Sequence, residues 1–393
     1  MEFVFCVCYE YTELMSKRIA VVGAGAWGGW SAFKLQEAGY EVTLFDKSDP
    51  GHALSGSGGK TRIIRMAYGG SPIYTEMVDY AFKAWERYAQ EWNETLYHPK
   101  EAIWMFRGID SLYAAASIPL MKEKGFELVE TDVKKLRKQY PSISFSDISS
   151  AFREPHVWFL EAAKSCGIVA EKFKSLGGQF LKKNVDQLTM KDDQCQITCE
   201  NDKFEFDQVV VACGPWAKEL IPELAHVVHV TRHEVYYFDA PEEYNELPIW
   251  VEFREGDQMY YGIPDHFGEG FKLAYDERQW SLEPDKDDRG VTPEILQKME
   301  AVLVNRFPAL TSPGLVKHHT CVYENSLDGD FIMDRKSNGR LIYLAGSSGH
   351  GFKMGPAVGQ MVLDAVSGEQ ELPSEFSIVR FKETGKIKSQ YQM

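Results

Sequence analysis

Three glycines near the start of the chain have the spacing of a dinucleotide-binding turn. Gly23, Gly25 and Gly28 follow a short apolar run and open a helix-like segment, and Asp46 ends the next apolar run about 20 residues on. The first glycine permits a tight turn, the second lets the backbone approach a pyrophosphate, and the third allows close helix packing. Backbone N–H groups at the helix start would face the phosphates, and Asp46 would accept hydrogen bonds from ribose hydroxyls. The motif alone does not separate FAD from NAD.

The segments around this turn predict the βαβ unit that must position it. Residues 19–22 are apolar and strand-like, residues 28–38 have helical periodicity, and residues 41–45 form a second apolar run. Residues 208–214 are a continuous apolar run that ends in glycine, as is typical of a buried parallel strand. Residues 234–275 alternate aromatic and polar side chains, which predicts an antiparallel sheet. The remaining predicted elements are helices at 73–92, 158–176 and 356–367 and a strand at 341–345.

Composition narrows the class of protein. The chain has 393 residues, of which 44% are hydrophobic and 13% aromatic, enough for a large core. A net charge of -15 argues against a nucleic-acid partner or an anionic membrane surface. Seven cysteines without a C-x-x-C pair favour a reducing compartment, and we expect the cytoplasm. No apolar run reaches the ~20 residues that span a bilayer, residues 1–9 make a poor signal peptide, and Met15 is a candidate natural start.

Further blocks of sequence carry glycine, aromatic and basic residues in a definite order. They are DPGH at 49–52 with GKTRIIRMAYG at 59–69, YYGIP at 260–264 with GFKL at 270–273, CVY at 321–323 with DFIMD at 330–334, and SGHGFK at 348–353 with Gly359. Together they resemble the monomeric sarcosine oxidase and N-methyltryptophan oxidase family of D-amino-acid-oxidase-like flavoproteins. The blocks keep the family's order and nearly its spacing over residues 17–368, and the resemblance implies that the dinucleotide is FAD.

The resemblance places two basic side chains beside the flavin. Arg62 is the natural candidate for a cation that stabilises the negative charge gained by the ring on reduction. Lys272 matches a lysine near the ring, where a fixed positive charge stabilises oxygen as it is reduced, so O2 is the expected electron acceptor.

Two more cations are implied to bind the substrate. Arg65 and Lys353 are far apart in sequence, yet in the resembled family both converge on the substrate carboxylate. A guanidinium can hold a carboxylate through two hydrogen bonds, and an ammonium adds a point charge. An amino-acid-like substrate follows, the alternative being two unrelated cations in separate salt bridges.

Cys321 matches the family's flavin-linked cysteine, whose sulfur bonds the 8α carbon of the ring. From composition alone a lone cysteine would be a small buried apolar residue, so its sequence context favours the covalent role. Tyr261 is either a pocket wall that contacts the amine or a packed core tyrosine. His350 lies in a glycine loop whose backbone is expected to face the flavin. We expect this backbone, rather than the His350 imidazole, to contact the flavin.

The site expectations are as follows. Catalytic roles are expected for Lys272, Arg62, Tyr261 and Asp276, and substrate contacts for Arg65, Lys353 and Tyr261; no metal is expected. Cofactor contacts are expected for Gly23, Gly25, Ala26, Trp27, Gly28, Asp46, Lys47, Arg62, Val185, Cys213, Gly214, Cys321, Gly349, His350, Gly351 and Lys353.

Two departures from the family pattern concern the substrate. Sarcosine-type members often carry histidines just before the Thr-Arg pair, where this chain has Ser57, Gly58 and Gly59, and a histidine four residues after the lysine, where it has Asp276. An acid there favours a more cationic amine, a substrate hydroxyl or a cyclic imine tautomer.

The expected reaction is FAD-dependent oxidation of the C–N bond of a secondary or N-substituted amino acid to an imine, with O2 reduced to H2O2. Alternatives are a pipecolate, cyclic imino acid or fructosyl amino acid oxidase, a flavin dehydrogenase with another acceptor, and a flavin-binding module without turnover. The substrate amine and the oligomeric state stay open, with a monomer favoured.

The expected fold class is α/β, or α+β overall, with a chain that crosses several times between two domains. A Rossmann-like FAD-binding domain would comprise residues 15–82, 154–225 and 315–393. A mixed antiparallel-sheet substrate domain would comprise residues 83–153 and 226–314, with the substrate between the two.

Overall fold

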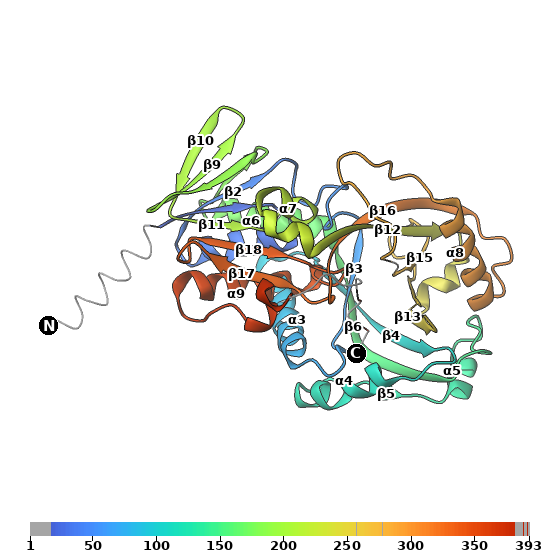
Figure 1. Cartoon of the computed structure of the whole chain (residues 1–393). Helices are drawn as coiled ribbons and strands as arrows, with labels where there is room; N and C mark the ends of the chain where they lie inside the picture. The colour runs from blue at the N-terminus through green and yellow to red at the C-terminus, as the bar shows by residue number, and fades with distance from the viewer. Residues whose placement is uncertain (1–16, 257, 277, 382–387, 389–390, 392–393) are drawn as a thin grey trace.

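A six-stranded sheet forms one half of the molecule (Figure 1). The computed structural model describes residues 17–256, 258–276, 278–381, 388 and 391, so the candidate start at Met15 lies outside the described residues. The strand order is β17-β18-β11-β1-β2-β7, parallel except for β17, which runs antiparallel to β18 at the edge. The strands are β1 (Arg18–Val22), β2 (Glu41–Asp46), β7 (Gln179–Lys182), β11 (Gln208–Val211), β17 (Ile332–Lys336) and β18 (Leu341–Ala345).

Both faces of this sheet are covered, which explains its apolar strands. Ile19 and Val21 of β1 pack in the core that contains α2 (Ala26–Glu37) and α9 (Gly355–Ser367). Ala20 and Val22 pack on the other side, toward a three-stranded antiparallel sheet. That sheet has the order β10-β9-β8, from β8 (Gln187–Met190), β9 (Cys195–Cys199) and β10 (Asp202–Phe206).

A nine-stranded sheet forms the other half of the described chain (Figure 1). Its order is β16-β12-β15-β14-β13-β4-β6-β3, with β5 beside β6, and its pairs are antiparallel except for the parallel pair β13–β4. The strands are β3 (Thr61–Ile64), β4 (Tyr97–Phe106), β5 (Val129–Glu130), β6 (Ser150–Glu161), β12 (Val228–Phe238), β13 (Ile249–Arg254), β14 (Gln258–Ile263), β15 (Phe271–Tyr275) and β16 (Leu315–Ser326).

The alternation of β12 separates two faces of this sheet. Tyr236 and Phe238 pack toward α8 (Pro293–Arg306), whereas Val235 and Tyr237 pack with Cys321 on the opposite face. The alternating aromatic residues in the sequence therefore cover both faces of this sheet, one of which packs against α8. The other helices are α3 (Pro72–Trp92), α4 (Leu112–Glu123), α5 (Val133–Gln139), α6 (Ala162–Ser175) and α7 (Ala217–Leu220).

The glycine turn before α2 is fixed by close backbone approach. Gly23 has φ +106°, and a Cβ there would lie 2.4 Å from the carbonyl oxygen of Ala212. A Cβ on Gly28 would lie 1.8 Å from the oxygen of Gly23. No larger residue fits either position, so the turn can hold the start of α2 against the ends of β1 and β11.

The fold class predicted from the sequence is confirmed, and one predicted boundary is wrong. The helix expected at 158–176 begins only at Ala162, because Trp158 and Leu160 extend β6 and pair with Ile64 and Arg62 of β3. Long-range pairing here decides between strand and helix. The proposed domain boundaries stay a prediction; β3 and β16 lie in the nine-stranded sheet although their residues were assigned to the FAD-binding domain.

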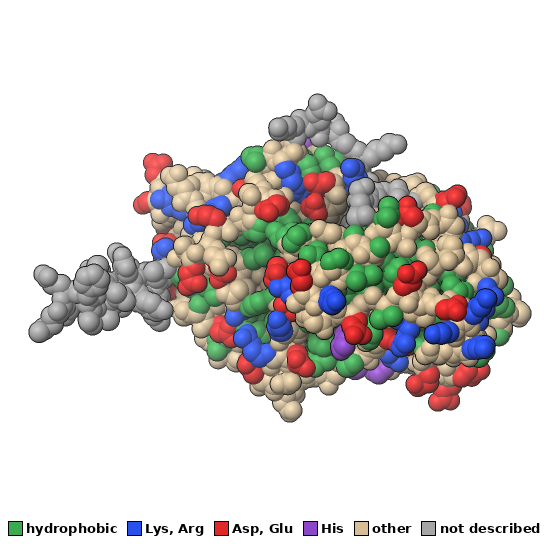
Figure 2. All heavy atoms as spheres, turned by 90° about the horizontal axis from the view of Figure 1, so that it is seen from below, with side chains coloured by type: hydrophobic (Ala, Val, Ile, Leu, Met, Phe, Trp, Pro, Cys, Tyr) green, Lys and Arg blue, Asp and Glu red, His purple; other side chains and the backbone are tan. Residues whose placement is uncertain are grey.

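On the face shown in Figure 2, acidic and basic side chains lie interspersed among hydrophobic ones. No helix in the described part of the chain is long and apolar enough to cross a membrane. Among the described residues, no cluster of His, Cys, Asp or Glu has a metal-binding arrangement.

Candidate functional site

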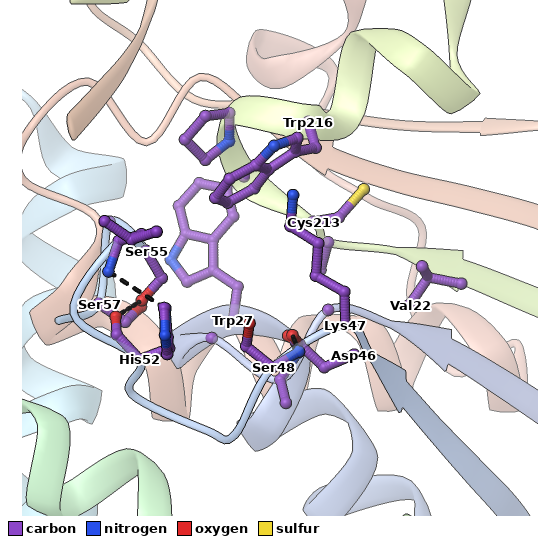
Figure 3. A pocket seen from close by; sticks show the side chains of 18 of the residues that line it. Val22, Trp27, Asp46, Lys47, Ser48, His52, Ser55, Ser57, Cys213 and Trp216 are labelled. Carbon is purple, nitrogen blue, oxygen red and sulfur yellow. Dashed lines mark hydrogen bonds between the residues drawn. The ribbon is translucent and has the colours of Figure 1, made fainter. Parts of the chain in front are cut away.

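A cavity of about 1250 Å³ opens at the carboxyl ends of β1, β2 and β11. Figure 3 shows Asp46 and Lys47 at the end of β2, Trp216 above Lys47, and Ser55 and Ser57 on the loop opposite. This is the edge of a parallel sheet at which dinucleotides bind. Predicted cofactor residues that line this cavity are Gly23, Gly25, Ala26, Trp27, Asp46, Lys47, Val185, Cys213, Gly214 and Gly351.

Asp46 is held in place by the glycine turn. Its Oδ2 accepts a hydrogen bond from the backbone N–H of Ala24 at 2.7 Å, and its Oδ1 accepts from that of Ser48 at 2.7 Å. Burial raises the pKa of Asp46, and the two N–H donors partly oppose that rise. The first N–H of α2, at Ala26, donates to Ser57 Oγ at 2.9 Å, so this helix start is capped by a loop serine.

Lys47 and Trp216 form a flat wall of the same cavity. The Lys47 ammonium lies 3.9 Å from the centre of the Trp216 ring and 2.8 Å from Asp285 Oδ1. Trp216 Nε1 donates to Asp285 Oδ2 at 2.7 Å. Asp285 therefore ties the cation and the indole together.

A second cavity, of about 790 Å³, lies on the inner face of the nine-stranded sheet. Predicted residues that line it are Arg62, Arg65, Tyr261, Lys272, Asp276, Cys321, Gly349, His350 and Lys353. Gly28 lines neither cavity and packs against Gly23 instead. The lining of this cavity thus brings together residues from six strands (β3, β12, β13, β14, β15 and β16) and from the segment before α9.

One strand lines both cavities. In β16, Cys321 and Tyr323 line the second cavity, and the alternate residues Val322 and Glu324 line the first. Phe352 lines both. The two cavities are therefore neighbours, and the strand alternation decides which side chain each receives.

Cys321 lies beside a cation. Its Sγ is 3.7 Å from Nη2 of Arg62, which also donates to the carbonyl oxygens of Gly56 at 3.0 Å and Gly58 at 2.7 Å. Burial raises the pKa of the Cys321 thiol, but Arg62, His319 and Lys272 outweigh it and bring that pKa down to about 6. The lowered pKa favours the thiolate form of Cys321 near neutral pH, which is the form of a reactive cysteine.

Lys272 is buried on β15 against the first residue of β3. Its Nζ donates to Thr61 Oγ1 at 2.8 Å and to Thr61 O at 3.2 Å. Burial, and next the positive charge of Arg62, lower the pKa of Lys272 to about 7. Its charge thus responds to what binds in the cavity.

Arg65 and Lys353 converge on one tyrosine. The Arg65 guanidinium lies 4.6 Å from the Tyr68 ring centre, and Lys353 Nζ donates to Tyr68 Oη at 3.0 Å and to His350 O at 3.3 Å. Burial and the charge of Arg65 hold the pKa of Lys353 well below its usual value. Among the described residues, buried Nη1 of Arg65 has no hydrogen-bond partner.

Aromatic residues line the same cavity as these cations. Tyr261 Oη lies 3.1 Å from His233 Nε2, and the His233 ring stacks on Tyr323 at 4.3 Å. Burial lowers the pKa of His233 to about 3, so the ring is neutral at pH 7. Asp276 pairs with Arg278 at 3.3 Å, and its buried Oδ1 has no partner among the described residues.

His350 uses both ring nitrogens within the protein. Nε2 lies 3.1 Å from Gly329 O and Nδ1 lies 3.3 Å from Tyr68 Oη, and the ring stacks on Phe331 at 4.5 Å. Since burial also holds its pKa well below the usual value, the imidazole is a neutral part of the structure.

A match to the family described as FAD dependent oxidoreductase covers residues 18–365. The chain belongs to this family. It is 28% identical over 377 residues to the monomeric sarcosine oxidase of Bacillus sp. (strain B-0618), with 92% of this chain and 95% of that protein covered. It is 24% identical over 383 residues to the N-methyl-L-tryptophan oxidase of Escherichia coli (strain SMS-3-5 / SECEC), covering 94% and 99%. The fold is similar to that of L-proline dehydrogenase from P. horikoshii, with a TM-score of 0.82, 19% identity and coverage of 94% and 99%.

As a member of this family the chain is an FAD-dependent oxidoreductase, and the first cavity fits FAD. Gly23 and Gly25, which have no side chains, line the cavity together with the carboxylate of Asp46, and these are the groups that suit a pyrophosphate and a ribose. Within the described part of the chain, buried Oε2 of Glu324 in this cavity has no hydrogen-bond partner, and a hydroxyl-bearing cofactor could satisfy it.

Several lining residues were not predicted from the sequence. They include His233, Tyr323, Glu324, Trp216 and Tyr391. His233 and Tyr323 lie on strands whose inward face could have been read from alternation with Val235 and Cys321. Tyr391 carries no comparable local signal.

Proposed function

We propose that the chain oxidises the C–N bond of a secondary or N-substituted amino acid to an imine and reduces O2 to H2O2. The observation that carries this proposal is the convergence of Arg65 and Lys353 on Tyr68 in a cavity that adjoins the FAD cavity. Two cations in a largely buried pocket call for an anionic ligand.

A substrate carboxylate satisfies both cations. We propose that it would meet two donors, the buried Nη1 of Arg65, which has no partner among the described residues, and a remaining N–H of Lys353. Its negative charge would raise the pKa of Lys353 and hold the ammonium in its cationic form. Recognition of the carboxylate then fixes the position of the adjacent carbon and amine.

The amine must react in its neutral form, because a protonated nitrogen has no lone pair to support loss of hydride from the neighbouring carbon. Tyr261 presents an aromatic face to that amine, and Asp276 offers an oxygen that accepts from an N–H group. We expect the rate to rise with pH through the pKa of the bound amine.

When bound, FAD supplies the two-electron acceptor that the side chains lack. We propose that Cys321 holds it covalently through the sulfur, with Arg62 keeping that sulfur ionised beforehand. Lys272 places a positive charge where O2 is reduced and so stabilises the negative charge that develops on oxygen. In the overall reaction the amine loses two electrons and two protons, and O2 gains both.

The fate of the imine depends on the substrate. An open-chain imine would be hydrolysed to an amine and a carbonyl compound, and a cyclic one would be retained. The unpartnered Oδ1 of Asp276 favours a cyclic or hydroxyl-bearing amino acid as a second candidate. A pipecolate, proline-like or fructosyl amino acid therefore stands beside sarcosine-like substrates.

We further propose a monomer in the cytoplasm, with residues 15–82, 154–225 and 315–393 as FAD-binding domain and 83–153 and 226–314 as substrate domain. Strands β3 and β16 would connect the two.

An anaerobic screen tests the proposed function. N-methyl, cyclic and glycated amino acids are mixed with the holoenzyme, and loss of flavin absorbance is followed. We expect at least one amine that carries a carboxylate to bleach the flavin, and H2O2 to form on admission of air. If only amines without a carboxylate bleach it, the roles of Arg65 and Lys353 are wrong; if air yields no peroxide, the enzyme is a dehydrogenase.

A further inference from the structure

Tyr391, the third residue from the end of the 393-residue sequence, lies in the second cavity against Arg65. Nη2 of Arg65 donates to Tyr391 Oη at 2.9 Å, and the guanidinium lies 5.1 Å from the centre of the phenol ring. Arg65 is 5% exposed, so this hydrogen bond is sheltered from water. A residue from the far C-terminus therefore occupies one of the donors that the proposed carboxylate site provides.

Three aromatic side chains hold the Tyr391 ring at an angle. Its centre lies 5.0 Å from that of Phe253, 5.1 Å from that of Tyr113 and 6.5 Å from that of Trp104, in edge-to-face arrangements with interplanar angles of 67–77°. Such pairs favour one defined ring position over a loose surface contact.

The described backbone upstream is tied to the same site. The N–H of Lys388 donates to Leu327 O at 3.0 Å, and its carbonyl accepts from Nη1 of Arg278 at 3.2 Å. Arg278 also pairs with Asp276, which lines the cavity. Tyr391 is therefore anchored at the pocket wall, and Lys388 is anchored beside the acid of the pocket.

We propose that Tyr391 is a specificity-determining residue, an inference that rests on the proposed function. While its oxygen accepts from Nη2 of Arg65, its O–H can turn toward a substrate carboxylate held by Nη1 of the same guanidinium. The carboxylate would then meet Arg65, Lys353 and the phenol together.

The Tyr391 ring also limits the size of the substrate. It fills the space between Arg65 and the aromatic group of Trp104 and Phe253, so the group attached next to the carboxylate must be small on that side. Removal of the ring would open this space to larger side chains.

Binding of two matched probes to the holoenzyme tests the inference. Pyrrole-2-carboxylate carries the charge, pyrrole-2-carboxamide lacks it, and both are titrated against the flavin absorbance spectrum. We expect Tyr391→Phe to weaken binding of the carboxylate by about tenfold, as for a lost hydrogen bond to a charged group, and to leave the amide unchanged. Tyr80→Phe, which removes a hydroxyl bonded to Gln360 outside the cavity, is the control and should bind both probes as the wild type does.

Tyr391→Ala tests the effect on size. The ratio of kcat/KM for N-methyl-L-tryptophan to that for sarcosine should rise by about tenfold or more. Arg65→Gln separates the two proposals. If it weakens carboxylate binding while both Tyr391 variants keep wild-type affinities and ratios, the inference fails and the proposed function stands. If Arg65→Gln binds the carboxylate as the wild type does, the proposed function itself fails.

Discussion

Nη2 of Arg62 lies 3.7 Å from the sulfur of Cys321, and it is the same nitrogen that donates to the oxygens of Gly56 and Gly58. The loop at residues 56–58 therefore holds the Arg62 guanidinium next to a cysteine on a distant strand. Burial alone would raise the pKa of this thiol. The lowered pKa of Cys321 therefore depends on the position of the Arg62 guanidinium.

The first prediction concerns covalent attachment of FAD. Wild-type protein precipitated with acid should give a yellow pellet, and Cys321→Ala should give a colourless pellet with free flavin in the supernatant. Because the pKa of Cys321 is lowered to about 6, covalent incorporation of FAD by apoprotein should rise through that pH and level off above it. Arg62→Gln should move this midpoint upward toward the ordinary thiol range. Cys166→Ala, which removes another buried cysteine, should retain covalent flavin.

The second prediction concerns Lys272 and oxygen. Lys272→Met should slow reaction of the reduced enzyme with O2 by about 100-fold or more, because it removes the charge that stabilises reduced oxygen. Anaerobic reduction by substrate should slow far less. Stopped-flow measurement of the two half-reactions separates these effects, with Lys272→Arg as the charge-conserving control. Equal slowing of both steps would contradict the role in oxygen reduction.

The features that the sequence predicts well are local. The βαβ unit at residues 18–46 follows from apolar runs and from glycines that no larger residue can replace. The residues at 59–69 and 348–353 were identified by motif, and Arg65 and Lys353 line the same cavity in the structure. Their meeting is a property of tertiary structure, and only the family resemblance made it predictable.

The features that sequence reasoning missed depend on distant partners. The end of β6 is a strand because β3 pairs with it, and helical periodicity in 158–176 could not reveal that pairing. Ser57 caps α2 across a loop, and Tyr391 reaches Arg65 across 326 positions. Neither contact leaves a local pattern.

The third prediction concerns proton uptake. Burial and the charge of Arg65 hold the pKa of Lys353 well below its usual value before a ligand binds. An anionic ligand raises that pKa, so binding of pyrrole-2-carboxylate at alkaline pH should be accompanied by proton uptake. Calorimetry in buffers of different ionisation enthalpy measures this uptake. It should vanish in Lys353→Met and for the neutral carboxamide; uptake that persists in Lys353→Met would assign the proton to another group.

The fourth prediction concerns Asp276. A carboxylate near the substrate amine stabilises the protonated amine and so raises its pKa in the complex. In Asp276→Asn the amide keeps the shape without the charge, and the rise of kcat with pH should move to lower pH by about one unit. The profile of anaerobic flavin reduction against pH measures this shift. An unchanged profile would mean that Asp276 does not act on the amine. Its role would then be to pair with Arg278, which also donates to the carbonyl oxygen of Lys388.

The fifth prediction concerns Glu324, an acid buried in the FAD cavity. Its Oε1 accepts from the N–H of Ser347 at 3.3 Å, and Oε2 has no partner among the described residues. Burial raises its pKa from 4.5 to about 7 in the folded protein. Between these two values the folded chain binds a proton that the unfolded chain has lost, so stability falls as pH rises and the cost is complete above pH 7.

Glu324→Gln keeps the acceptor for Ser347 and replaces the unpartnered oxygen by an amide that needs no proton. The comparison is made in Cys321→Ala protein from which FAD has been removed. There the Glu324→Gln variant should have the same free energy of unfolding as its parent near pH 5. At pH 8 its free energy of unfolding should be higher, by at most about 3 kcal/mol for a shift of this size. Urea unfolding at the two pH values measures the difference. Glu243→Gln, at an exposed position, should show no such dependence on pH. If Glu324→Gln changes stability equally at both pH values, the carboxyl is not protonated in the folded protein, and its orphan oxygen must be satisfied by water instead.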